Sequence, residues 1–178
     1  MRHIPNILST FRIILIPFLA YSILEGNTST AAIILIASGV TDLLDGFLAR
    51  RYGWVSQIGK VLDPFADKLT QITVCVLFAY TFRRFWAFYI VLIAKEIVML
   101  VVGGYLMRKG VKLEGARWFG KLTTVLFYVS MSLIALVPDL PTAVTVCLLL
   151  ATTASALTSF ALYIPEYFTY RRQMEQES

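Results

Sequence analysis

The sequence predicts an all-α integral membrane protein with six transmembrane helices, and three observations support this fold class. Of the 178 residues, 58% are hydrophobic and 15% are charged, whereas a soluble domain carries about 25% charged residues. The mean hydropathy is +0.73. The apolar residues also gather in six stretches of about 20 residues, the length that an α-helix needs to cross a bilayer. We therefore expect a single transmembrane catalytic domain over residues 1–178.

The six predicted helices are joined by short connections. They cover residues 6–24, 30–51, 62–81, 85–107, 119–137 and 142–163. The first lacks a small-residue cleavage site after its apolar run, so we expect it to stay in place as a helix rather than be removed as a signal peptide. Gly26 and Asn27 favour a turn before the second helix, two glycines lie between the second and the third, and Pro138 and Pro141 favour a turn before the sixth.

Lysine and arginine are distributed unequally between the two ends of these helices. With the N-terminus inside the cell, the cytoplasmic ends hold Arg2, Arg50, Arg51, Lys60, Arg108, Lys109, Lys112, Arg117, Lys121, Arg171 and Arg172. The opposite ends hold only Arg83 and Arg84. Because Lys and Arg concentrate in cytoplasmic connections, both termini are predicted to be cytoplasmic. The net charge of +5 is then explained by membrane topology rather than by nucleic-acid binding.

Four acidic residues lie close together in or beside the second and third predicted helices. They are Asp42, Asp45, Asp63 and Asp67. Charged side chains at bilayer depth cost several kcal/mol, so they usually mark a functional site. Residues three or four apart share one helical face, so each pair points in one direction. Because the second helix runs toward the cytoplasm and the third returns, the two pairs are expected to meet just below the cytoplasmic surface.

The chemistry of these side chains indicates a hard cation. Four carboxylates cannot all stay ionised together in a low dielectric without a counter-ion. Ligands that are all oxygen suit Mg²⁺, Mn²⁺ or Ca²⁺. The only histidine, His3, is interpreted as a surface residue. Cys75 and Cys147 lack the spacing of a metal site and are interpreted as buried helix residues without a disulfide.

Small and basic residues extend the acidic pattern. Gly46 and Ala49 leave room for a bulky group beside the backbone, and Arg50 at the helix end suits a phosphate. The full series reads Asp42-x-x-Asp45-Gly46-x-x-Ala49-Arg50, eight residues, Gly59-x-x-x-Asp63-x-x-x-Asp67. It resembles the signature of the CDP-alcohol phosphotransferase family, with the family residue at every signature position. The six-helix plan resembles that family over nearly the whole chain.

This resemblance implies an activity and a set of roles. The activity is transfer of a phosphatidyl group from CDP-diacylglycerol to an alcohol, with release of CMP, in phospholipid synthesis. Asp42, Asp45 and Asp63 are implied to bind divalent metal, two ions of Mg²⁺ or Mn²⁺. Asp67 is implied to be the general base and a further metal contact. The positions implied to accommodate the cytidine diphosphate are Asp42, Gly46, Ala49, Arg50 and Gly59. A homodimer in the bacterial cell membrane, with a cytoplasmic active site, is also expected.

The start of the chain bears on which alcohol is the acceptor. The segment Ile4-Pro5-Asn6-Ile7-Leu8-Ser9-Thr10-Phe11-Arg12 is similar to the opening of phosphatidylglycerophosphate synthases and of eukaryotic-type cardiolipin synthases. The acceptors of these two enzymes are glycerol 3-phosphate and phosphatidylglycerol. Asn6 and Arg12 are candidate polar contacts near the cytoplasmic mouth, although Asn6 is alternatively a helix cap.

Basic residues around the fifth helix favour glycerol 3-phosphate. The candidate acceptor-binding residues are Arg108, Lys112, Arg117 and Lys121. Topology and anionic lipid headgroups explain the same residues equally well. Lys95-Glu96 and Gly103 favour the other acceptor, because bacterial phosphatidylglycerophosphate synthases usually have Arg-Glu and a later Arg there. Lys95 and Glu96 are either a charged pair that supports the site or a buried structural pair.

Each feature also has an explanation that does not involve catalysis. Small residues often pack membrane helices together, and Arg50 also follows the positive-inside pattern. Four intramembrane acids are also compatible with a cation-coupled transporter. Transporter sites, however, lie near the bilayer midplane and often between inverted repeats. These acids lie toward one side and the sequence shows no repeat, so the enzyme is favoured.

Overall fold

The computed structural model describes residues 4–52, 59–108, 118–137 and 139–176, and these form helices joined by short turns. The elements are α1 (Ile4–Leu24), α2 (Thr28–Tyr52), α3 (Gly59–Thr81), the 3-10 helix η1 (Arg83–Phe85), α4 (Trp86–Arg108), α5 (Trp118–Leu136) and α6 (Thr142–Gln176). Within these ranges there is no strand. The predicted all-α class with six long helices is therefore confirmed.

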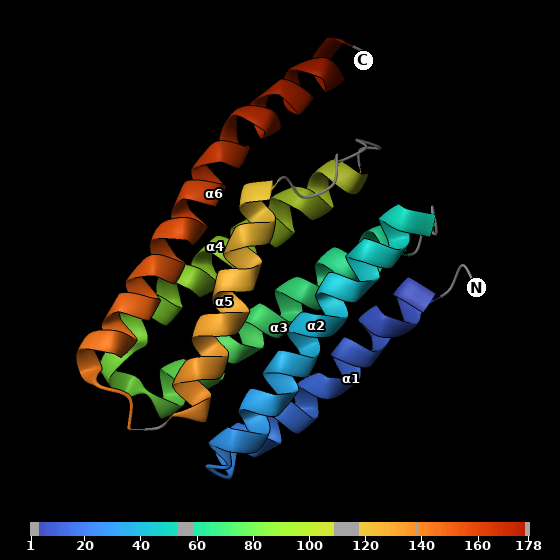
Figure 1. The fold of residues 1–178 in the computed structure, drawn as a ribbon. Coiled ribbons are helices and arrows are strands. Elements are labelled where there is room, and N and C mark those ends of the chain that lie inside the picture. Colours follow the sequence, from blue (N-terminus) through green and yellow to red (C-terminus); the bar gives the residue numbers. More distant parts are fainter. Residues whose placement is uncertain (1–3, 53–58, 109–117, 138, 177–178) are drawn as a thin grey trace.

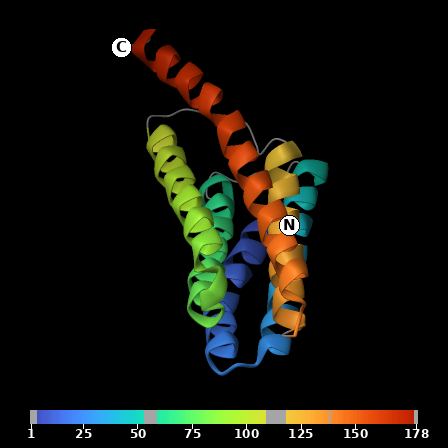
Figure 2. The same cartoon turned by 90° about the vertical axis from the view of Figure 1, so that its left-hand side faces the viewer.

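Successive helices run in opposite directions through one bundle (Figure 1). The N-terminal ends of α1, α3 and α5 lie at the same end of the bundle as the C-terminal ends of α2, α4 and α6. We call this the acidic end, because all four signature aspartates lie in its half of the helices. The sixth helix was predicted to end at residue 163, but α6 continues through Pro165 to Gln176. Its last turns project beyond the other helices (Figure 2).

The turn between α1 and α2 forms as the sequence predicts. Gly26 has a φ of 74°, a left-handed conformation that favours glycine because a side chain there would be strained. The side-chain oxygen of Asn27 accepts a hydrogen bond from the backbone N–H of Thr30 at 3.1 Å. Asn27 therefore caps the start of α2, which begins immediately after it.

Within the described ranges, five helices are long and apolar enough to span a bilayer, and α3 is not among them. The N-terminal half of α3 carries charged residues, including Asp63, Asp67 and Lys68. α3 packs against both α1 and α4, so much of its surface is covered by protein. Large apolar side chains are exposed on the outer helices instead, such as Phe18 (59% exposed) and Ile33 (64% exposed). Apolar surface of this extent is expected where lipid replaces water as the solvent.

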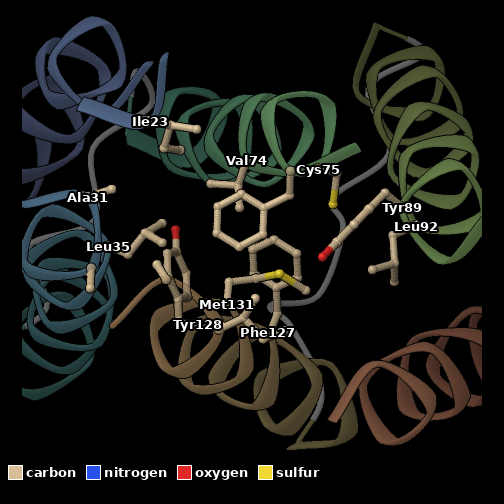
Figure 3. Close-up of a cluster of buried hydrophobic side chains, with 14 of the residues drawn as sticks. Ile23, Ala31, Leu35, Val74, Cys75, Tyr89, Leu92, Phe127, Tyr128 and Met131 are labelled. Atoms are coloured by element: carbon tan, nitrogen blue, oxygen red, sulfur yellow. The ribbon is translucent and has the colours of Figure 1, made fainter. Parts of the chain in front are cut away.

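The apolar core lies in the half of the bundle away from the acidic end. Val74 and Cys75 of α3 face Phe127 and Met131 of α5 across the centre of the bundle (Figure 3). Phe78 meets the ring of Tyr89 edge to face, with centroids 6.0 Å apart, an arrangement that aromatic rings prefer. This packing fixes the C-terminal half of α3, and the helix also packs against α1, which carries the contacts to its acidic N-terminal half.

The two cysteines differ from the sequence prediction in one respect. Cys75 is buried in the core, as predicted, and it is not in a disulfide. Cys147 of α6 is exposed, so its predicted burial is wrong. The reason is physical: in a membrane helix, a lipid-facing position and a buried position are both apolar, and hydropathy does not separate them.

Candidate active site

Three helices bring the four signature aspartates to the acidic end of the bundle. Asp42 and Asp45 lie on α2, and Asp63 and Asp67 lie on α3. Helix α1 packs against both α2 and α3, and so holds the two acidic pairs near each other. Asp45 is buried, and the other three aspartates are partly buried. The hydroxyl of Ser9 on α1 contacts both Asp45 of α2 and Asp63 of α3, so acids of the two pairs lie on either side of one small side chain. The predicted meeting of the two pairs therefore occurs.

Arg12 of α1 joins the two acids of α2. Its side chain is fully buried, with 0% exposure. Its Nη1 donates to Oδ1 of Asp42 at 2.6 Å, and its Nη2 donates to Oδ2 of Asp45 in a short hydrogen bond. A buried arginine is costly unless acids pair with it, and these two provide that pairing. Arg12 was predicted as a candidate polar contact near the cytoplasmic mouth, and in the structure its partners are two signature residues.

Ser9, one turn before Arg12, connects the acids of α2 with those of α3. Its hydroxyl donates a short hydrogen bond to Oδ1 of Asp63 and lies 3.5 Å from Oδ2 of Asp45. Ser9 is also fully buried. The sequence analysis did not single it out. The available signal was its spacing of three residues from Arg12, which places both side chains on one face of α1. Asn6 lies inside α1, which begins at Ile4, so it is not a helix cap.

Asp67 is held by two neighbours on its own helix. The amide Nε2 of Gln71 donates to Oδ1 of Asp67 at 2.9 Å. The ammonium of Lys68 lies 3.4 Å from Oδ2 of the same carboxylate. The side chain of Asp67 is 14% exposed, so one edge of it remains accessible. Both carboxylate oxygens therefore have a defined partner.

A second group of charges lies between α3 and α4, next to Asp67. Lys68 Nζ is 2.8 Å from Oε2 of Glu96, and Lys95 Nζ is 2.6 Å from Oε1 of Glu96. The contact between Lys95 and Glu96 confirms that they form a charged pair. Lys68 was not among the predicted site residues, and its position directly after a signature acid was the only available signal. Lys68 connects this pair to the acidic site.

A largely apolar groove begins at Asp42 and runs between α2 and α5. Its volume is about 280 Å³. It is lined by Ile36, Gly39, Val40, Asp42, Leu43, Thr124, Val125, Tyr128, Val129, Ser132 and Leu133. Gly39 makes room for Tyr128, because a Cβ at position 39 would lie 3.1 Å from Cγ of that ring. The side chain of Asp42 is 25% exposed, so an acid of the site is accessible from the groove.

Comparison with known proteins supports the same reading as this geometry. The family model described as CDP-alcohol phosphatidyltransferase matches residues 2–163. The chain belongs to that family. A CDP-diacylglycerol–glycerol-3-phosphate 3-phosphatidyltransferase of Aquifex aeolicus strain VF5 is 34% identical over 137 residues, covering 75% of this chain and 74% of the relative. The Escherichia coli K12 protein of the same name is 33% identical over 136 residues, covering 73% and 75%.

A second enzyme name also occurs among the relatives in this family. A cardiolipin synthase (CMP-forming) of Streptomyces coelicolor is 36% identical over 129 residues, covering 68% of this chain and 59% of the relative. Membership of the CDP-alcohol phosphatidyltransferase family favours the enzyme over the cation-coupled transporter considered above. Together with the long apolar helices, it makes this chain a multi-pass membrane protein.

The other predicted site residues are only partly placed by the structure. Gly46 is half-buried next to Asp45, and Gly59 is buried at the start of α3. Ala49 and Arg50 lie in α2, and Arg108 ends α4, but their side chains are outside the described residues. Lys112 and Arg117 fall wholly outside the described ranges. Lys121 is exposed in the first turns of α5. The acceptor-binding role of these four cations therefore stays a prediction.

The donor set of this CDP-alcohol phosphatidyltransferase fits a hard cation in its chemistry. All four side chains offer carboxylate oxygens, which Mg²⁺ and Mn²⁺ prefer. Within the described part of the chain, no three His, Cys, Asp or Glu side chains are arranged as a metal centre. Asp42 and Asp45 instead each turn one oxygen to Arg12. Each keeps a second oxygen, so the cluster retains capacity for further ligation.

Proposed function

We propose that this chain transfers the phosphatidyl group of CDP-diacylglycerol to glycerol 3-phosphate and releases CMP. The observation that carries the proposal is the gathering of four signature acids at one end of the bundle, where Asp42 also lines a largely apolar groove. A nucleotide-activated lipid has both a diphosphate and acyl chains. The acidic site suits the diphosphate together with its counter-ions, and the groove between α2 and α5 suits an acyl chain.

In the proposed reaction, Asp67 accepts the proton of the acceptor hydroxyl. That oxygen forms a bond to the phosphorus that carries the diacylglycerol, and the bond from this phosphorus to the CMP oxygen breaks. CMP leaves with the electron pair. Two partners hold the Asp67 carboxylate for this task, Gln71 and Lys68. Gly46, Ala49, Arg50 and Gly59 are proposed to accommodate the cytidine diphosphate.

Two divalent cations, either Mg²⁺ or Mn²⁺, are proposed to bind at Asp42, Asp45 and Asp63. Asp67 is proposed as a further contact. When bound, such cations neutralise phosphate charge and stabilise the leaving group. Ser9 and Arg12 orient these carboxylates from α1 through the contacts described above. Partners that orient ligating groups in this way typically matter for metal affinity.

The proposed setting is the bacterial cell membrane, with the acidic end and both termini in the cytoplasm and with the chain as a homodimer. The asymmetry of Lys and Arg supports this orientation. A cysteine introduced within residues 52–59 should resist impermeant thiol reagents in intact cells and react after lysis. Its ready modification in intact cells would reverse the orientation. Chemical crosslinking in the membrane tests the dimer, which a chain that stays monomeric would contradict.

Phosphatidylglycerol is the second candidate acceptor, because Lys95-Glu96 and Gly103 depart from the pattern of phosphatidylglycerophosphate synthases. The deciding experiment supplies purified protein with CDP-diacylglycerol and each acceptor separately, and identifies the lipid product by mass spectrometry. The proposal predicts phosphatidylglycerophosphate from glycerol 3-phosphate. Cardiolipin from phosphatidylglycerol, with no phosphatidylglycerophosphate, would establish the second candidate.

A further inference from the structure

We propose that Glu96 on α4 is a positioning residue for Asp67 and acts through Lys68. The inference rests on the proposed function, in which Asp67 is the general base. Neither Glu96 nor Lys68 belongs to the signature. Their contacts nevertheless form a continuous path from α4 to a carboxylate oxygen of Asp67 on α3.

Lys68 lies between two acids that belong to different helices. Its Nζ is 2.8 Å from Oε2 of Glu96 and 3.4 Å from Oδ2 of Asp67. The exposed fractions of the Lys68, Glu96 and Asp67 side chains are 17%, 5% and 14%, so water competes little for these contacts. A lysine side chain has four rotatable bonds and does not stay in one place by itself. The closer acid, Glu96, therefore decides where the ammonium lies.

Glu96 is itself held in a fixed orientation. Its second oxygen, Oε1, is 2.6 Å from Nζ of Lys95. The side chains of Lys95 and Glu96 are both buried, with exposures of 6% and 5%. Because each oxygen of Glu96 has its own ammonium partner, rotation of the carboxylate would break one contact or the other. In a poorly hydrated interior such broken contacts are costly.

The result is a carboxylate of Asp67 that is fixed from both sides. Gln71 holds Oδ1 from one turn further along α3, and Lys68 holds Oδ2. A general base acts within hydrogen-bond reach of the proton that it takes. A misplacement of about 1 Å can cost about 100-fold in rate. The contact between Lys68 and Asp67 depends on α4, because Glu96 of α4 holds the ammonium of Lys68 in place.

Charge balance explains why the loss of Glu96 should disturb Asp67. The group contains two cations, Lys68 and Lys95, and two acids, Glu96 and Asp67. Without the charge of Glu96, Asp67 becomes the strongest partner left for Lys68. The ammonium would then move toward Asp67 and pair with it directly. The carboxylate would turn toward Lys68 and away from the acceptor hydroxyl.

The test compares four variants of the full-length protein in the same lipid vesicles: Glu96→Gln, Lys68→Met, Lys68→Arg and Lys95→Met. For Glu96→Gln and Lys68→Met we expect kcat to fall by about 10- to 100-fold. The KM values for both substrates should change by less than about threefold. Lys68→Arg should retain most of kcat, because a guanidinium can contact both acids at once.

Lys95→Met tests the outer part of the same path, because Lys95 holds Oε1 of Glu96 while Lys68 holds Oε2. Its kcat should lie between that of Glu96→Gln and that of the wild type, because Glu96 keeps its contact with Lys68. The double variant Lys68→Met with Glu96→Gln should be no slower than Lys68→Met alone, because both changes break one path. Wild-type kcat in Glu96→Gln, or losses that simply add in the double variant, would overturn the positioning role.

Asp67→Asn, measured in parallel, separates this inference from the proposed function. If Asp67→Asn retains turnover, the base assignment fails, and the positioning role fails with it. If Asp67→Asn is inactive while Glu96→Gln has wild-type kcat, only the positioning role fails. Loss of turnover in Asp67→Asn, with the graded losses given above, supports both.

Discussion

Nη1 of Arg12 lies 2.6 Å from Oδ1 of Asp42, and this contact joins the first helix of the bundle to the signature of the second. The same guanidinium also binds Asp45, so one cation serves two acids that repel each other. The side chain of Arg12 is fully buried. Helix α1 is therefore part of the candidate active site, although none of its residues belongs to the signature.

Arg12→Gln should destabilise the fold strongly. It removes the counter-charge of the buried Asp45 and the partly buried Asp42, and breaking a buried ion pair from one side typically costs about 3–5 kcal/mol. Thermal unfolding of the purified protein in detergent measures the loss. Arg51→Gln is the control, because Arg51 is exposed on α2, where its guanidinium lies over the ring of Phe47. Equal unfolding temperatures for the two variants would show that the Arg12 contacts contribute little.

Gly39→Val should impair use of CDP-diacylglycerol with long acyl chains. A Cβ at position 39 would lie only 3.1 Å from the ring of Tyr128. A branched side chain there would therefore push into the groove. We expect kcat/KM for a long-chain donor to fall by about 10-fold or more, with a smaller loss for a short-chain donor. Gly103→Val is the control, because nothing lies within 4 Å of a Cβ there. The same loss for both donors would argue against an acyl chain in the groove.

Arg117→Ala or Lys121→Ala should weaken the use of glycerol 3-phosphate. A small dianion that leaves water needs paired cations. We expect a higher KM for this acceptor, by about 10-fold per lost cation, because charged hydrogen bonds are worth about 1.5–3 kcal/mol. The KM for CDP-diacylglycerol should change less. Steady-state kinetics with each substrate varied in turn measures both. An unchanged acceptor KM in both variants would assign these cations to topology or lipid contact.

Removal of divalent cation should abolish turnover. Among the described side chains, Arg12 and Lys68 compensate the four carboxylates only in part, and binding a diphosphate beside these acids requires further positive charge. Excess chelator should stop CMP release, and added Mg²⁺ or Mn²⁺ should restore it. A chelator with its Mg²⁺ sites already filled is the control. Undiminished CMP release in free chelator would exclude the proposed metal role.

Much of the site could be predicted from sequence because it depends on spacing. Asp42 and Asp45 are three apart, Asp63 and Asp67 are four apart, and the chain reverses between them. Any antiparallel pair of helices then brings the two acidic faces to one depth. The same logic applies to the Gly26–Asn27 turn, whose residues act through local backbone conformation and capping.

What the sequence did not reveal depends on how each helix is rotated about its axis. In a soluble protein, an apolar stripe reports that rotation, but here both the lipid face and the core face are apolar. This rotation decides three features of the structure: that Cys147 is exposed, that Ser9 is buried and that Lys68 contacts Glu96. The end of α6 was misplaced for a different reason. The polar residues beyond Pro165 end the apolar stretch without ending the helix.

The central claim is that the carboxylate of Asp67, held between Gln71 and Lys68, takes the acceptor proton at the acidic end of the bundle. The most direct test is the initial rate of CMP release by Asp67→Asn, with CDP-diacylglycerol and glycerol 3-phosphate at saturation. Asparagine has the same shape but cannot accept the proton, so the rate should fall by about 100- to 10,000-fold. The unfolding temperature should stay close to that of the wild type. Wild-type CMP release by a folded Asp67→Asn protein would contradict the account.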